Sequence, residues 1–227
     1  HFGNMLSLSP NGSYGNVDSF NSAPSYQLAA GMTGGGTGVA WTPSALNYSG
    51  TPAPNGGNTV ANGTIPANAT EGGLVVGTNP NGGVPVGSNA WLTGTAFTLP
   101  SPISNFTFEF DHWYHVHTPS NVNGDMDGVW LEYKLDNGSW TWLEPESGYN
   151  NTISPNATVP SGANQSGNGS HGFPVWAKTT YSGWEHSVFG LDNLTGINNA
   201  TNINFRFRIW TDQNSTVRPG WFIDNIT

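Results

Sequence analysis

The chain has 227 residues, of which 8% are charged and 12% are aromatic, and its net charge at pH 7 is −9. Disordered chains show the opposite balance of charged and apolar residues, so this composition predicts a folded protein with a sizeable core. The negative charge argues against a nucleic-acid partner, and the sequence contains no apolar run of membrane-spanning length.

Glycine and proline, 31 and 16 residues, favour short strands joined by turns over helices. In the N-terminal part, strands are predicted at 26–30, 38–41 and 73–76, with a loop over 44–70. Because apolar patches recur, we expect residues 1–84 to be the N-terminal part of a single domain, 1–227, with a glycan-bearing loop. A separate disordered segment is the alternative.

Residues 85–227 show clearer strand patterns. Phe106, Phe108 and Phe110 alternate with polar residues, so their rings are expected on one face of a strand. The same alternation predicts further strands at 128–135, 140–143, 184–191, 203–210 and 221–223, with a tight turn at 136–139 and a loop over 147–172. Strands of this number and spacing predict an all-β fold, an antiparallel two-sheet β-sandwich.

Charged residues recur on the outward faces of these strands. Arg206 and Arg208 share one such face, and Glu109, Asp111 and Glu132 are predicted to face outward as well. We expect cross-strand ion pairs among these five side chains. Independent, solvated charges are the alternative.

The acceptor tripeptide for N-linked glycans, Asn-x-Ser/Thr, is unusually frequent. Chance pairing would give about five such sequons in a chain of this composition. The sequence has 14: Asn11, Asn47, Asn62, Asn68, Asn105, Asn137, Asn150, Asn156, Asn164, Asn168, Asn193, Asn199, Asn214 and Asn225. Because N-glycosylation requires export, we expect an extracellular or cell-surface protein that carries N-linked glycans. Sequons without any cysteine suggest an archaeal source.

Several blocks in the second half resemble a known module. They are Phe-Asp-His-Trp-Tyr at 110–114, Asp-Gly-Val-Trp-Leu-Glu-Tyr at 127–133, Asp-Asn-Gly-Ser-Trp at 136–140, Tyr-Ser-Gly-Trp at 181–184, Phe-Arg-Phe-Arg at 205–208 and Pro-Gly-Trp-Phe-Ile-Asp-Asn at 219–225. Their order is similar to the MAM-like jelly-roll module of immune-inhibitor-A-type peptidases and other secreted microbial proteins. The resemblance implies a jelly-roll β-sandwich and an accessory, non-catalytic role. From the sequons in the loops, we expect this fold to carry long glycosylated loops.

Calcium is the cofactor to consider for this chain. Members of that family often carry acidic residues after the first aromatic pair, where this chain has His115 and His117. An acidic turn nevertheless contains Asp125 and Asp127, whose oxygens suit calcium, with Asp224 as a further ligand. A turn held by Asx hydrogen bonds is the alternative.

Three other constellations bear on chemistry. His112, His115 and His117 are clustered, and the last two are expected on one side of a strand, where they could share a transition metal. Loop or edge histidines that pair with carboxylates are the alternative. Glu109 and Asp111 have the spacing of a glycosidase carboxylate pair, although their strand belongs to the non-catalytic family pattern.

Tryptophan is the third constellation. Trp130 and Trp210, predicted to face outward, would stack on sugar rings or else fill core.

These observations favour a non-catalytic, glycosylated structural or adhesive module. We expect it to self-associate, or to associate with other surface proteins, in a filament or S-layer-like assembly. The alternative is a calcium- or carbohydrate-binding accessory domain of a secreted peptidase or glycosidase, which would belong to a longer protein. An enzyme in its own right, using Glu109 and Asp111, is the third hypothesis.

Overall fold

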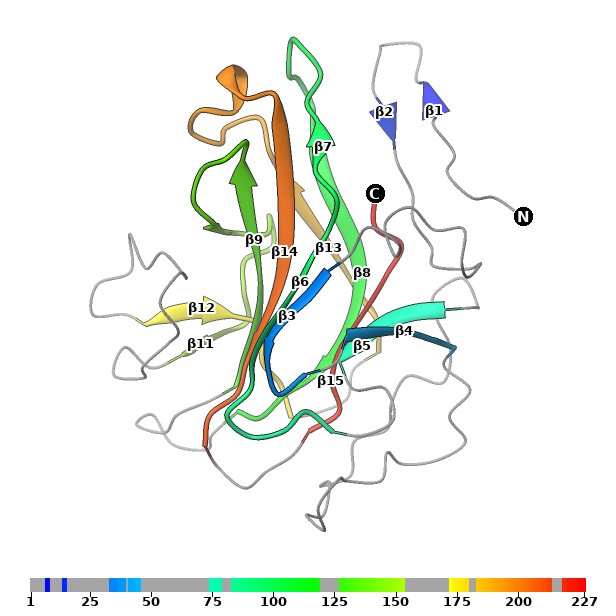
Figure 1. The fold of residues 1–227 in the computed structure, drawn as a ribbon, viewed down its shortest axis with the longest axis vertical. Helices are drawn as coiled ribbons and strands as arrows, with labels where there is room; N and C mark the ends of the chain where they lie inside the picture. The colour runs from blue at the N-terminus through cyan, green and yellow to red at the C-terminus, as the bar shows by residue number, and fades with distance from the viewer. Residues whose placement is uncertain are drawn as a thin grey trace.

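The computed structural model describes residues 7–8, 14–15, 33–39, 41–45, 74–78, 83–118, 127–153, 172–179, 183–213 and 218–227. In these ranges the chain is built of antiparallel strands, with one 3-10 turn, η2 (Ile197–Asn199). Two large sheets form a sandwich, and the long strands β8, β9 and β14 run nearly along the long axis of the molecule (Figure 1).

The first sheet has six strands. Its order is β10 (Thr141–Leu143), β9 (Gly128–Leu135), β14 (Asn202–Trp210), β6 (Asn89–Thr93) and β3 (Thr33–Thr37), with β7 (Phe97–Thr98) also pairing with β14. Central β14 sets Arg206 opposite Glu132 on one side and opposite Thr93 on the other. Side chains at these alternate positions therefore share the outer face of the sheet.

The second sheet has five strands. Its order is β13 (Glu185–Gly190), β8 (Thr107–His115), β15 (Gly220–Asp224), β5 (Leu74–Thr78) and β4 (Trp41–Ala45). Two short hairpin sheets, β1 (Ser7–Leu8) with β2 (Tyr14–Gly15) and β11 (Asn151–Ile153) with β12 (Phe173–Val175), are separate from it. Strands β3 and β4, which come from the N-terminal 84 residues, contribute one edge strand to each large sheet.

The core lies between the two large sheets and is rich in aromatic rings. Phe108 of β8 stacks on Phe205 of β14, with ring centroids 3.8 Å apart and planes 13° apart. Phe110 meets Phe207 edge-to-face at 5.1 Å. Alternation predicted this inward row, because successive side chains on a strand point to opposite faces.

Two expectations about local structure were wrong in part, and one strand was missed. Of the strand predicted at 38–41, Gly38 and Val39 lie outside the strands, whereas Trp41 begins β4. The loop predicted over 147–172 contains β11, and β6 was missed because outward Trp91 obscures its alternation. The strand predicted at 26–30 lies outside the described residues.

Candidate functional site

Glu109 and Asp111, the predicted carboxylate pair, lie on the outer face of the five-stranded sheet with a histidine between them. Nδ1 of His186 is 2.7 Å from Oδ1 of Asp111, and its Nε2 is 3.2 Å from Oε2 of Glu109. Thr107 donates to the other oxygen of Glu109 at 2.8 Å, and Asn225 donates to the other oxygen of Asp111 at 2.8 Å. All four carboxylate oxygens are thus engaged within the protein, as in a structural network.

This network also shifts the titration of its histidine. The pKa of His186 is raised, chiefly by its hydrogen bond with Asp111 and further by Glu109, against an opposing effect of burial. His186 therefore carries its proton to higher pH than a free histidine and neutralises part of the carboxylate charge. Both carboxylates of the predicted catalytic pair are therefore partners of the same histidine.

The predicted ion pairs divide between the two sheets. Arg206 pairs with Glu132, as expected, donating from Nε at 2.7 Å and also from Nη2. No pair joins either arginine to Glu109 or Asp111, because β14 and β8 belong to different sheets. Alternation gives the face that a side chain occupies but does not give the neighbouring strand.

The three clustered histidines separate. His112 points into the core, where Nε1 of Trp221 donates to its Nδ1 at 3.2 Å and Ser187 lies 3.0 Å from its Nε2. Since an indole N–H only donates, His112 is the neutral tautomer protonated on Nε2. Burial lowers its pKa to about 3.

His115 and His117 do not form the predicted pair. His115 is on the opposite face of β8 from His112 and is buried, which lowers its pKa to about 4. His117 comes after β8 ends, so it does not share the strand periodicity. Within the described part of the chain, no group of three histidine or acidic side chains is placed to hold a metal ion.

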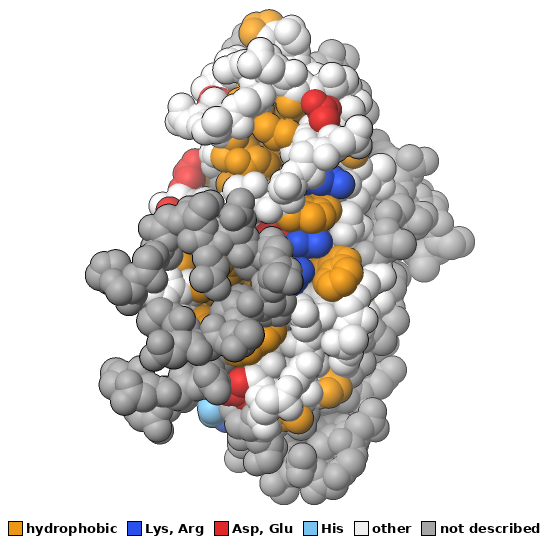
Figure 2. Space-filling view, turned by 60° about the vertical axis from the view of Figure 1, so that its left-hand side comes forward, with side chains coloured by type: hydrophobic (Ala, Val, Ile, Leu, Met, Phe, Trp, Pro, Cys, Tyr) orange, Lys and Arg blue, Asp and Glu red, His pale blue; other side chains and the backbone are white. Residues whose placement is uncertain are grey.

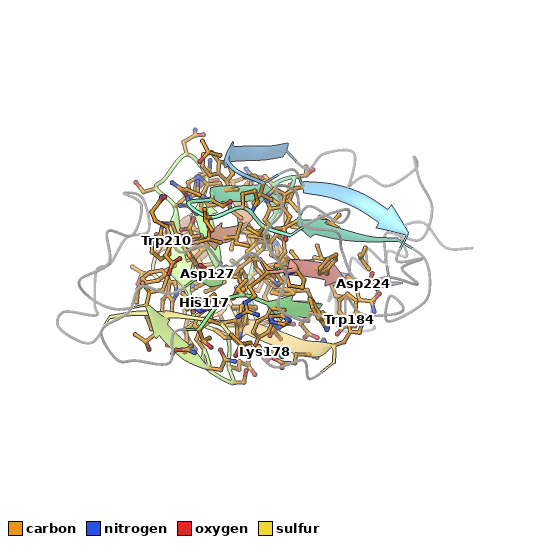
Figure 3. The ribbon with its side chains drawn as sticks, turned by 90° about the horizontal axis from the view of Figure 1, so that it is seen from below. His117, Asp127, Lys178, Trp184, Trp210 and Asp224 are labelled. Carbon is orange, nitrogen blue, oxygen red and sulfur yellow. The ribbon has the colours of Figure 1, made fainter. Side chains whose placement is uncertain are left out.

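Two of the calcium candidates lie far apart, and the third, Asp125, lies outside the described residues. Asp127 accepts hydrogen bonds from the backbone N–H of His117 and Asp212, both at 3.0 Å. Asp224, by contrast, is opposite Asp111 on β8. Asp111 precedes His117 by six residues, which is roughly 20 Å along an extended chain, so Asp224 and Asp127 lie near opposite ends of this stretch. Figure 3 shows Asp127 and Asp224 in separate parts of the molecule.

The carboxylate of Asp127 acts as a backbone cap in this structure. Burial is the largest influence on it and raises its pKa to about 7, although the two N–H donors act in the opposite direction. A carboxylate that joins β9 to the segments after β8 and β14 holds one end of the sandwich together. Asp127 thus joins three segments of the chain and does not lie near Asp224, while the turn that contains Asp125 lies outside the described residues.

The two tryptophans predicted as sugar platforms differ in exposure. Trp130 is on the outer face of β9 but has no exposed surface, so it is not a platform. Trp210, at the end of β14, is partly exposed. The sequence pattern gave the correct face for both but did not reveal that neighbouring side chains cover Trp130.

A set of side chains that the sequence did not single out as a unit covers the outer face of the six-stranded sheet. We call it the Trp–Arg face, and its members are Trp91, Trp130, Glu132, Trp140, Arg206 and Arg208. The Cζ atom of Arg206 is 4.4 Å from the ring centroid of Trp140 and 5.5 Å from that of Trp91. The Cζ atom of Arg208 is 5.3 Å from Trp91 and 5.5 Å from Trp130. The guanidinium groups thus alternate with indole rings in cation–π contact.

One buried carboxylate anchors this face. Glu132, which is fully buried, accepts from Arg206 on Oε2 and from the indole N–H of Trp130 on Oε1, at 2.9 Å. Arg206 and Arg208 are exposed by only 7% and 3%. Two nearly buried cations therefore share one buried anion. The sequence contains the residues of this cluster, but their pairing becomes visible only with the register of β9, β14 and β6. In that register, a tryptophan or an acidic residue lies opposite each arginine.

Comparisons with known proteins give little further guidance. Neither a protein-family model nor a curated protein matches the sequence. Among solved structures, the chain is similar to the K2 cleaved adhesin domain of Lys-gingipain, with 15% identity and a TM-score of 0.43 over 92% of this chain and 96% of that one. So low a likeness assigns no function, and the resemblance to MAM-like modules stays a prediction. No helix among the described residues has the length and hydropathy to cross a membrane.

Proposed function

We propose that this chain is a non-catalytic, N-glycosylated extracellular module with a structural or adhesive role. The position of the sequons supports it. Five sequon asparagines of the described ranges are exposed and lie outside the strands: Asn105, Asn137, Asn150, Asn193 and Asn199. Oligosaccharide attachment needs an accessible side-chain amide, and turns and connections offer one.

At two sequons, contacts of the side-chain amide count against a glycan. Asn225 is only partly exposed, and its Nδ2, the atom that would carry the sugar, donates to Asp111. Asn150 is exposed, but its Nδ2 donates to the hydroxyl of Tyr114 at 2.9 Å. We therefore expect glycans at Asn105, Asn137, Asn193 and Asn199, and none at Asn225.

Glycopeptide mass spectrometry of protein secreted by its natural cells tests this proposal. Asn137→Gln should lower the mass of the intact protein by one glycan, and Asn225→Gln, the matched control, should leave the glycan content unchanged. Bare asparagines at all four expected sites would remove the support for an extracellular location.

The fold is further proposed to be a jelly roll, because the chain passes between the two large sheets at most successive strands. A subunit of a filament or S-layer-like assembly is the specific form of the role that we propose. Electron microscopy and sedimentation of the native glycoprotein test it, and dispersed monomers at every concentration would contradict self-association.

The proposed alternative is an accessory domain that binds calcium or carbohydrate for a secreted peptidase or glycosidase. For calcium, no group of three histidine or acidic side chains among the described residues supports a site. For carbohydrate, the Trp–Arg face supplies partly exposed indoles beside cations and polar side chains, which is the chemistry of a sugar site. Carbohydrate binding is therefore the branch of this alternative that an observation favours.

A further inference from the structure

We propose that the Trp–Arg face binds an anionic saccharide, with the guanidinium group of Arg208 holding a sugar carboxylate and Trp91 contacting the sugar ring. The inference deepens the proposed adhesive role by naming a ligand class. It rests on that role only in placing the ligand outside the cell.

The first argument is the charge balance of the face. Both oxygens of Glu132 are already engaged, by Arg206 and by Trp130. Among the described residues Arg208 therefore has no carboxylate of its own, and the buried group of two arginines and one glutamate carries a net charge of +1. Burial of an uncompensated charge is costly, and an anionic ligand would offset that cost.

The second argument is the set of unused donors on Arg208. Its one hydrogen bond within the described part of the chain runs from Nη2 to Oδ1 of Asn89, at 2.9 Å. Its Nε is buried without a partner among those residues. The Nη1 atom of Arg208 has no hydrogen bond among those residues and is not fully buried, and a charge-assisted pair between a guanidinium donor and a carboxylate is among the strongest hydrogen bonds in proteins.

The third argument is the concentration of positive charge on this face. Three of the five cationic residues of the chain, Lys134, Arg206 and Arg208, project from β9 and β14 on the outer side of the sheet, although the net charge of the chain is −9. Figure 2 shows blue side chains in a short row with hydrophobic ones between them. This face is thus electrostatically complementary to an anion, unlike the rest of an acidic chain.

The aromatic side chains favour a saccharide over another anion. Trp91 lies directly over Gly35 of β3, where a Cβ atom would be 2.5 Å from the indole ring. Trp91 and Trp140 are both partly exposed, and Asn89, Thr93 and Asn204 project from the same outer face. A flat indole beside neutral hydrogen-bonding groups suits the C–H face and hydroxyl groups of a sugar.

The experiment compares two ligands of the same shape on the intact glycoprotein. Calorimetric titration with trigalacturonate should show binding, and its methyl ester, which lacks the charge, should bind at least about tenfold more weakly. Affinity for trigalacturonate should also fall as salt is added. This arm needs no variant, so it does not depend on the folding of a mutant.

Variants then locate the site. Arg208→Gln should weaken trigalacturonate binding about tenfold or more, Arg208→Lys should restore only part of it, and Trp91→Ala should also weaken it. Lys178→Gln removes one cation outside the Trp–Arg face and should change the affinity less than about twofold. Thermal unfolding of each variant verifies that it is folded.

Several outcomes would overturn the inference. These are absence of binding, equal binding of the methyl ester, or unchanged binding by folded Arg208→Gln. If a hexaglutamate peptide bound equally well, the partner would be an acidic protein instead. If the protein bound no sugar but self-associated, and Arg208→Gln abolished that self-association, the partner would be a second copy of the chain. If the protein is glycosylated but binds no sugar, this inference is refuted and the proposed function stands. If the protein lacks glycans but binds trigalacturonate, the inference stands and the proposed function loses its support.

Discussion

The outer faces of the two large sheets combine aromatic and charged side chains in opposite ways. On the six-stranded sheet, the charges of Glu132 and Arg206 are buried, and indole rings lie between the cations. On the five-stranded sheet, the aromatic side chains of Trp113 and Phe222 are fully buried, while the charged group centres on His186, whose side chain is 54% exposed. Similar alternating strands therefore produce one face that depends on electrostatics and one that depends on apolar burial.

The largest expected effect comes from removing the buried anion of the six-stranded sheet. Glu132→Gln preserves the shape of the side chain but leaves Arg206 and Arg208 without a counter-charge. We expect a loss of about 3–5 kcal/mol in the free energy of unfolding, measured by denaturant titration. A loss as small as that of Asp111→Asn, the matched isosteric change on the other sheet, would abolish the contrast between the two faces.

The next effect concerns the two histidines on the outer face of the five-stranded sheet. Burial lowers the pKa of His115 to about 4, so between about pH 6.5 and pH 4 the unfolded chain binds a proton that the folded chain does not. Stability contributed by neutral His115 is present above pH 6.5 and is lost as the pH falls toward 4.

Between about pH 4 and pH 6.5, the free energy of unfolding should rise with pH less steeply in His115→Leu than in the wild type. The difference in slope should be up to about 1.4 kcal/mol per pH unit. Exposed His186 has the opposite sign, because its raised pKa adds stability below pH 6.5 that is lost as the pH rises through its folded-state pKa. Denaturation at several pH values, together with NMR titration of both rings, measures the two signs. A wild-type slope retained in His115→Leu would contradict the assignment.

Glycines under aromatic rings give a third comparison between the faces. A Cβ atom at Gly77 would be 2.6 Å from the ring of Phe222, as close as one at Gly35 would be to Trp91. Phe222 is fully buried and Trp91 is partly exposed, so only Trp91 has room to move aside. We expect Gly77→Ala to cost about 1–3 kcal/mol and Gly35→Ala less, by thermal unfolding. The reverse order would show that the Trp–Arg face is the more rigid one.

The smallest effect is expected at the exposed network of the five-stranded sheet. His186→Ala breaks contacts with Glu109 and Asp111, but solvent screens them, and the loss of stability should be under about 1 kcal/mol at pH 6. It should shrink further as salt is added. A salt-independent loss of several kcal/mol would mean that this network, like Glu132, is a main support of the fold.

Much of the secondary structure follows from the sequence. Phe106, Phe108 and Phe110 face the core as their spacing of two residues requires, and the predicted turn at 136–139 joins β9 to β10, with Asp136 at φ 46°. The sequons are equally a property of the sequence, since glycan acceptors are read from three residues. Such local features need no knowledge of the partner strand.

The pairing of strands was decided by the tertiary structure. Alternation placed Glu109, Glu132 and Arg206 on outer faces, but only the sheet order sets Glu132 beside Arg206 and leaves Glu109 to His186. The same holds for Trp130, whose outward position was predictable and whose burial was not. The reason is physical: a strand's period fixes the direction of each side chain, whereas its burial and its partners depend on residues distant in sequence.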